Sequence, residues 1–234
     1  MKSDRLTKRL TATVLTGMLG ACNGAAPKPA DESAEARATD GMLLAEDFEA
    51  YAPGKLPADF EPHETNGFGN VARWGVAVGA DGAHCVRVEA ANKGQTFNLL
   101  LSERSFPKDL ECSVRVRADA GQEDQGGGLV WRARDHKNYY ITRWNPLEQN
   151  LRVYKIVGEV RTQLQSANVA ADPKAWHELS ASMVGSRIRV SFDGQPLLEV
   201  DDATFPEGGY VGLWTKADAS TAFDDFRVAT PSPR

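Results

Sequence analysis

The chain has 234 residues, of which 41% are hydrophobic and 25% charged, a composition typical of a globular protein large enough to bury its own core. Its formal net charge is −5, and removal of the first 21 residues, which carry a net charge of +3, leaves −8. An acidic chain has no electrostatic attraction for phosphate backbones or anionic lipid. The composition therefore argues against nucleic acid as a partner.

The N-terminus has the features of an export signal. A basic stretch, MKSDRLTKRL, precedes a short apolar stretch, TATVLTGMLG, which is well below the ~20 residues that a membrane span needs. The LGAC that follows resembles the bacterial lipobox, whose cysteine is acylated after cleavage. The resemblance implies a signal peptide at 1–21 and a lipid anchor on Cys22, and Asn23 after the cysteine implies transport to the outer membrane.

Residues 22–41 follow the predicted signal peptide and are rich in Ala, Pro, Ser and charge, without apolar periodicity. They are predicted to form a disordered tether that reaches up to ~60 Å from the membrane. The folded domain is expected at 42–230 and a short tail at 231–234. The predicted location is the cell envelope, with contact to the membrane only through the lipid anchor.

The folded part consists of short alternating runs separated by turn signals. LECSVRVRA and RIRVSF each place apolar residues on one face, and DG at 193–194 is a hairpin signal. About a dozen strands in one unit predict an all-β sandwich or barrel, and the length exceeds that of an immunoglobulin domain. No internal repeat points to a propeller. A single large jelly roll fits best.

Two cysteines remain besides Cys22. Alternation places Cys112 on the core face of its strand and Cys85 on the face opposite Val86 and Val88. Two separate small hydrophobic residues are therefore favoured over a disulfide.

Four segments carry a family resemblance: DFEAYAPGKLP, GGGLVWRARDHKNYYITRWNPLEQNLRVYKI, AWHELSASMVGSRIRVSFDGQPLLEV and GYVGLWTKADASTAFDDFRV. Together they resemble the concanavalin A-like lectin/glucanase superfamily, and within it bacterial LamG-like domains and the 3-keto-disaccharide hydrolase domain family. The resemblance covers about residues 44–229. It implies two curved antiparallel sheets, termini paired on one sheet, and a sugar bound on the concave face.

The central strands suggest which residues bind that sugar. Tyr139, Ile141, Arg143 and Asn145 share one face of their strand, and Arg143 is expected to project into an open, curved hollow. Aromatic rings stack on the apolar face of a pyranose, and guanidinium, amide and ammonium groups reach its hydroxyls. Solvated arginines and half-buried aromatic packing are the alternative. Trp176 is predicted to belong to the core. The predicted ligand-binding residues are Arg132, Tyr139, Arg143, Asn145, Lys155, Trp214 and Lys216.

Three function classes remain open: a carbohydrate-binding domain, a hydrolase or lyase acting on 3-keto-disaccharides or glycosides, and a structural or protein-interaction module. Laminarinase-like relatives carry Glu-x-Asp-x-x-Glu on one strand, and the sequence lacks this triplet, which disfavours a retaining glucanase. His136, Glu148 and Lys155 are the groups that could serve as a base toward a 3-keto sugar. No catalytic residue is assigned.

Metal ligands are sparse in the sequence. Its four histidines, at positions 63, 84, 136 and 177, have no ligand spacing and are expected on surfaces or turns. Asp47 near the first strand and Asp224 or Asp225 in the last could meet where the termini pair, which leaves a structural calcium ion as an alternative to plain edge-strand charge. No other cofactor is predicted.

Overall fold

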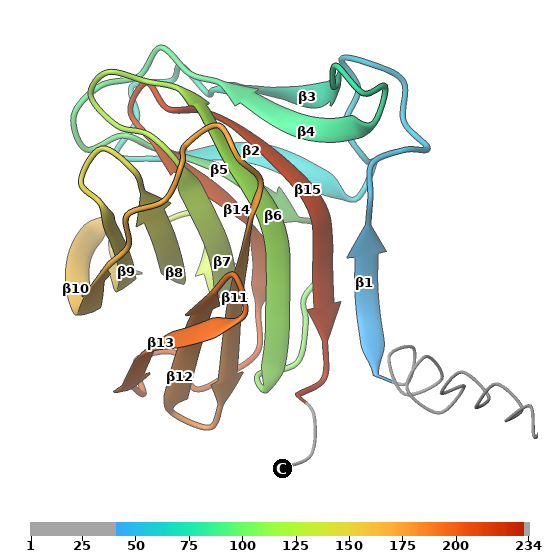
Figure 1. Ribbon diagram of the computed structural model, residues 1–234. Helices are drawn as coiled ribbons and strands as arrows, with labels where there is room; N and C mark the ends of the chain where they lie inside the picture. Colours follow the sequence, from blue (N-terminus) through green and yellow to red (C-terminus); the bar gives the residue numbers. More distant parts are fainter. Residues whose placement is uncertain (1–40, 232–234) are drawn as a thin grey trace, which may run out of the picture.

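The computed structural model describes residues 41–231 (Figure 1). The predicted signal peptide, Cys22 and nearly all of the tether and tail lie outside these residues. Within 41–231 the chain forms fifteen strands and no helix, arranged as two antiparallel sheets, so the all-β sandwich prediction is confirmed. This part of the chain accordingly offers no helix long and apolar enough to cross a membrane.

Sheet A contains both ends of the described chain. Its first strand pairs with its last, so the predicted pairing of the termini is confirmed, and the two strands run side by side in Figure 1. HELSASMV, RIRVSF and QPLLEVD form a three-stranded antiparallel meander, with the hairpin signal at 193–194 in its second turn. Across the sheet the order is β13 (Gln195–Asp201), β12 (Arg187–Phe192), β11 (His177–Val184), β6 (Leu110–Ala120), β15 (Ser220–Ala229), β4 (His84–Glu89) and β3 (Arg73–Val78), and β1 (Met42–Glu46) also pairs with β15.

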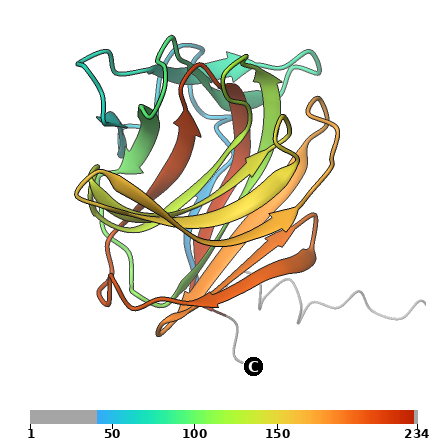
Figure 2. The ribbon, with the colours of Figure 1, turned by 90° about the vertical axis from the view of Figure 1, so that its left-hand side faces the viewer.

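Sheet B contains the central strands whose two faces both carry large residues. Adjacent strands of this sheet all run antiparallel to each other. Figure 2 shows how strongly this sheet curves. Across the sheet the order is β10 (Val160–Asn168), β9 (Asn150–Val157), β8 (Asn138–Asn145), β7 (Gly127–Asp135), β14 (Tyr210–Lys216), β5 (Phe97–Ser102) and β2 (Phe60–Thr65).

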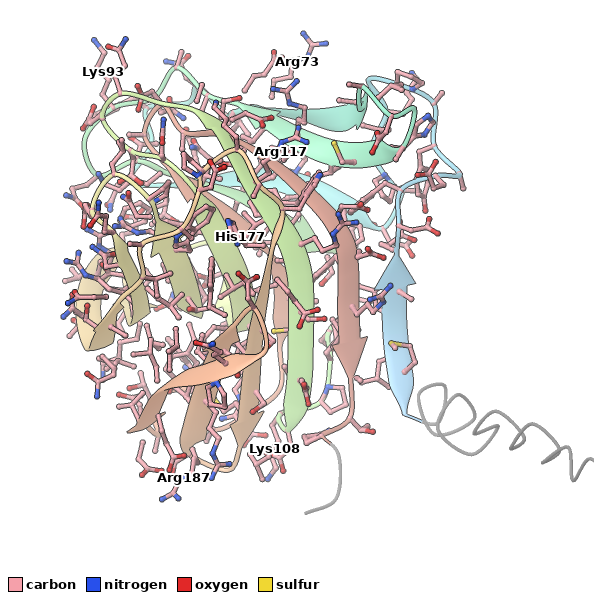
Figure 3. The ribbon with its side chains drawn as sticks, in the orientation of Figure 1. Arg73, Lys93, Lys108, Arg117, His177 and Arg187 are labelled. Carbon is pink, nitrogen blue, oxygen red and sulfur yellow. The ribbon has the colours of Figure 1, made fainter. Side chains whose placement is uncertain are left out.

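The main core lies between the two sheets. In β6, Leu110, Cys112, Val114 and Val116 point inward as their alternation predicts, and sheet B contributes Trp131, Tyr140, Trp144 and Leu213, all buried. His177, expected on a surface or turn, is buried here instead, because its ring packs on Trp144 and Phe192 while its nitrogens bond the Asp193 carboxylate and the Asp172 carbonyl. Figure 3 shows its position on β11 in the middle of the sandwich.

The outer face of sheet A corrects one prediction. Trp176, expected in the core, lies on this face, where it is half-buried between the guanidinium groups of Arg115 and Arg117, 5.0 and 4.6 Å from its ring centre. Trp176 and the two arginines help to cover Cys85, which is buried although its side chain points away from the main core. Cys85 and Cys112 are both free thiols on opposite faces of the sheet.

Sheet B curls so far that its outer face becomes concave and encloses a second core. Three strands separate β2 from β8, yet Thr65 Oγ1 on β2 lies 2.8 Å from the Tyr139 hydroxyl on β8. Gly128 permits tight bending, since a Cβ there would collide with the Thr142 carbonyl of the next strand. The second core consists of Phe97, Leu99, Leu101, Val130, Ala133, Tyr139, Ile141, Tyr154, Ile156 and Trp214.

Candidate functional site

Five of the seven predicted ligand residues do lie on the concave face of sheet B. β8 places Tyr139, Arg143 and Asn145 there, and β14 places Trp214 and Lys216 there. Their shared face follows from the alternation seen in the sequence, but their exposure does not. Arg143 is 1% exposed and Trp214 is fully buried, so the expectation of an open hollow at Arg143 is wrong. The curl of the sheet packs the centre of this face with apolar side chains.

The other two predicted ligand residues point elsewhere. Arg132 has a left-handed backbone conformation (φ 46°) at a bulge in β7, and the bulge directs its side chain beneath the surrounding loops. There its guanidinium donates hydrogen bonds to the carbonyls of Lys108, Phe205 and Gly185 at 2.7–2.9 Å. Lys155 shares the opposite, inter-sheet face with Tyr140 and donates to Asp202 at 2.7 Å. Both residues therefore join parts of the fold together.

The concave face holds a buried ion network around Asp124, a residue that no sequence pattern singles out. Arg143 Nη1 lies 3.3 Å and Lys216 Nζ 3.1 Å from Asp124 Oδ2, and Asn145 Nδ2 donates to Oδ1 at 3.1 Å. Both Asp124 and Arg143 are 1% exposed. Burial raises the pKa of the Asp124 carboxyl, and the nearby charges of Arg143 and Lys216 oppose that rise.

The same network continues to the surface at the β8–β9 turn. Glu148 Oε2 lies 3.1 Å from Arg143 Nη2 and 2.7 Å from Arg152 Nη1. Arg152 also contacts the Tyr154 hydroxyl at 3.4 Å, and Arg161 on β10 lies over the ring of Tyr154 at 4.7 Å. We call Asp124, Arg143, Glu148, Arg152, Arg161 and Lys216 the cationic cluster.

Where β2 meets the β7–β8 turn, the concave face is bridged. The rings of His63 and His136 stack with centroids 5.6 Å apart, and Thr65 donates a hydrogen bond to the His136 carbonyl. Farther along, Asn66 donates to Glu159 at the β9–β10 turn. These contacts close the curl over the second core.

An open pocket of about 380 Å³ lies beside this bridge, on the concave side of sheet B. The partly exposed ring of Tyr210 contributes to its wall, together with the two stacked histidines and the exposed guanidinium of Arg134. Burial lowers the pKa of His63, Glu61 at 3.6 Å opposes the change, and the neighbouring His136 adds to it. The lining residues are Glu61, His63, Leu101, Ser102, Glu103, Arg134, Asp135, His136 and Tyr210.

The sequence alone did not indicate this open pocket, although His136 was among the groups considered as a base. Its residues come from four separate strands and two turns, and none of them forms a local motif. The sequence signal for the pocket is limited to Glu61 and His63, which are two residues apart on one short strand and therefore share a face.

The suggested calcium ligands have other partners. Asp224 and Asp225 both pair with Arg115, at 3.3 and 3.4 Å, and Asp225 also pairs with Arg227. Asp47 accepts a hydrogen bond from the Glu49 amide within its own turn. Across residues 41–231, no group of three or more His, Cys, Asp or Glu side chains is arranged to hold a metal ion.

Comparisons with known proteins agree with this architecture. Residues 120–231 match the family described as the galactocerebrosidase C-terminal lectin domain. The carbohydrate-binding module CBM66 from Bacillus subtilis superposes with a TM-score of 0.61 at 17% identity, over 74% of this chain and 96% of that one. The chain has the concanavalin A-like lectin/glucanase fold.

Other solved structures of this concanavalin A-like fold are equally distant in sequence. The Ca²⁺- and mannose-bound exoplasmic/lumenal domain of VIP36 gives a TM-score of 0.56 at 13% identity, over 82% of this chain and 90% of that one. SCLam, a non-specific endo-β-1,3(4)-glucanase, gives 0.58 at 14% identity, over 80% and 89%. No curated protein sequence matches the chain. In this concanavalin A-like domain, the open pocket and the cationic cluster are both polar sites on the concave face of sheet B.

Proposed function

We propose that this chain is a carbohydrate-binding domain that holds its saccharide in the open pocket of sheet B. The observation that carries the proposal is a pocket of about 380 Å³ whose wall combines aromatic rings with convergent charged groups. That volume lies within the range of roughly 300–1,000 Å³ that small-molecule sites occupy. The lectin-domain match and the carbohydrate-binding module with the same fold support this ligand class.

The chemistry of the open pocket suits a sugar ring. The Tyr210 and His136 rings offer apolar faces on which the C–H face of a pyranose can stack. Arg134 supplies forked donors, and Glu61 and Glu103 supply acceptors for hydroxyl groups. Arg134 also lies over the Phe205 ring at 5.2 Å, which orients its guanidinium.

The test is a glycan array probed with the full chain, followed by titration of the glycans that bind. Arg134→Ala is expected to weaken binding about tenfold, corresponding to about 1.4 kcal/mol. Arg187→Ala, which removes another exposed arginine at the far end of sheet A, is the matched control and is expected to bind normally. Equal affinity of the two variants would remove the open pocket as the binding site.

We further propose that the domain is displayed on the cell envelope, most simply at the outer membrane, through acylation of Cys22. The lipobox-like LGAC and the tether-like composition of residues 22–41 support this placement. Fractionation of cells that express Cys22→Ser tests it: the protein is expected to leave the membrane fraction. Retention of the variant in membranes would contradict the anchor.

An enzymatic role toward 3-keto-disaccharides is the second candidate function, and His63 favours it. Because burial lowers the pKa of His63, its ring is predominantly neutral at pH 7 and can accept a proton, and Arg134 in the same pocket can stabilise a developing enolate. Of the groups considered from sequence, Lys155 and Glu148 are held in ion pairs, and His136 lines the pocket. Sugar release from a 3-keto glycoside, abolished by His63→Asn, would establish this role.

A further inference from the structure

The cationic cluster carries more positive than negative charge. Arg143, Arg152, Arg161 and Lys216 supply four cations, and Asp124 and Glu148 supply two carboxylates. The six side chains form a continuous path from β14 to β10, linked by ion pairs and by the Tyr154 ring. The cluster as a whole has an excess of two positive charges, and its buried members Arg143, Lys216 and Asp124 have an excess of one. A buried positive charge in excess is unfavourable unless an anion balances it.

Unpaired donors point to the same conclusion. Arg143 is 1% exposed, and its Nε has no hydrogen-bond partner among the described residues. Arg161 Nη1, on the same concave side, is likewise buried without an acceptor within 41–231. A buried donor without an acceptor costs about 1–3 kcal/mol, so two of them on one face call for an explanation.

Access to the cluster is from the β8–β9 turn. The side chains of Glu148 and Arg152 are 43% and 30% exposed, whereas Arg143 lies beneath them. Glu148 places one carboxylate oxygen between Arg143 and Arg152, at 3.1 and 2.7 Å, and accepts a further bond from Asn150. The geometry of this rim therefore already accommodates a carboxylate, and that carboxylate is carried by a partly exposed turn.

We propose that the cationic cluster is a second binding site on the concave sheet, which takes the carboxylate of an acidic saccharide such as a uronic acid and displaces Glu148 from Arg143 and Arg152. This inference rests on the proposed carbohydrate-binding function but uses different residues from the open pocket. Guanidinium groups match a carboxylate in two-point geometry, which favours Arg143 and Arg152 as the receiving pair. Arg161 adds positive charge over the Tyr154 ring at the same rim.

Isothermal titration of the full chain at low ionic strength tests the inference, with trigalacturonic acid and its fully methyl-esterified form as probes. The ester keeps the rings and removes the charges. The acid is expected to bind at least tenfold more tightly than the ester. Glu148→Gln is expected to tighten binding of the acid severalfold, because it removes both the competing carboxylate and its repulsion, and to leave the ester unchanged.

Arg161→Gln is the test of the cluster itself, because this side chain is only partly buried and makes ring contacts rather than a buried ion pair. It is expected to weaken binding of the acid about tenfold without changing the affinity for the ester. Arg189→Gln, which removes the same charge from another partly exposed arginine, on sheet A, is the matched control.

Three outcomes overturn the inference. Equal affinities for acid and ester, with both binding, would leave the proposed carbohydrate-binding function intact and remove only the acidic subsite. Equal effects of Arg161→Gln and Arg189→Gln on the acid would show that binding follows net charge rather than the cluster. Failure of both probes to bind, with a neutral glycan still bound on the array, would likewise overturn the subsite alone.

Discussion

The outer faces of the two sheets carry similar residues in opposite environments. On sheet A, Arg187 pairs with Asp201 and Arg189 with Glu199, and all four side chains are between 27% and 56% exposed. On sheet B, Arg143 pairs with Asp124, and both are 1% exposed. In both sheets the arginine alternates with inward-pointing apolar residues. The difference comes from curvature: one face is open to water, and the other closes on itself.

Curvature also changes the energetics of each pair. An exposed ion pair gains little, because water screens both charges and two flexible side chains must be ordered. A buried pair gains little as a whole too, because both charges lose their hydration, but removal of one partner leaves the other uncompensated. The buried pairs of sheet B are thus expected to be sensitive to single substitutions, and the exposed pairs of sheet A tolerant of them.

The largest expected effect follows from Asp124→Ala. The substitution leaves Arg143 and Lys216 without their shared carboxylate in a buried site, and we expect a loss of about 3–5 kcal/mol in the free energy of unfolding. Asp201→Ala on sheet A is the matched change and is expected to cost about 0–1 kcal/mol. Urea denaturation of both variants measures the two losses in the free energy of unfolding. Similar losses in the two would mean that burial does not distinguish the two faces.

The sequence predicts the elements of this comparison well. Alternation in β6 and β12 identifies the residues that face the main core, and alternation in β8 groups Tyr139, Arg143 and Asn145 correctly. The period of two is a local property of the backbone, so a short segment is sufficient to reveal it. The resemblance to concanavalin A-like proteins then supplies the layer arrangement, including the pairing of β1 with β15.

What the sequence does not reveal is how far sheet B curls. The closure depends on Thr65 meeting His136 and Asn66 meeting Glu159, contacts between residues 71 and 93 positions apart. No local sequence pattern encodes contacts between residues so far apart in the chain. The bulge that redirects Arg132 is similarly invisible, because it follows from an irregular register between β7 and β8. The curl accounts for the burial of Arg143 and Trp214, and the bulge accounts for the position of Arg132, whereas Lys155 lies on the inter-sheet face through regular pairing with Tyr140.

The Asp202 carboxylate, which follows β13 and contacts β8 and β9, gives the next largest effect. Burial alone would raise the pKa of Asp202, but hydrogen bonds from Lys155, Thr204 and Tyr140 outweigh it and lower that pKa to about 2. An unfolded aspartate titrates near pH ~3.9. Because the folded pKa is the lower one, the stabilisation is fully present above about pH 4 and is lost as the pH falls toward 2, and it amounts to about 2 kcal/mol.

Asp202→Asn is therefore expected to lower the free energy of unfolding by about 2 kcal/mol at pH 7, with the difference from the unmodified chain shrinking to near zero at pH 2. Its exposed neighbour provides the control, Asp201→Asn, which separates the effect of Asp202 from the general titration of carboxylates. Urea unfolding at pH 7, 4, 3 and 2 gives the profile. A difference that stays constant down to pH 2 would show that the Asp202 carboxylate is not the source of the stabilisation.

The smallest expected effect is the difference in stability between Tyr→Phe substitutions at two positions of the concave face. Tyr139 lies in its closed centre, and Tyr210 lies in the open pocket. Thr65 uses its hydroxyl proton on the His136 carbonyl, so the Tyr139 hydroxyl donates to Thr65 Oγ1 at 2.8 Å. Tyr139→Phe is expected to cost about 1 kcal/mol, whereas Tyr210→Phe is expected to stay within about 0.5 kcal/mol.

The background variant Thr65→Val sharpens this last prediction. With Thr65 replaced, the Tyr139 hydroxyl is buried without its acceptor, so Tyr139→Phe in that background should be neutral or stabilising. Urea denaturation of the two single variants and the double variant gives the coupling energy directly. A Tyr139→Phe cost that is the same in both backgrounds would show that the hydrogen bond across the curl does not hold β2 against β8, and the closed concave face would then depend on apolar packing alone.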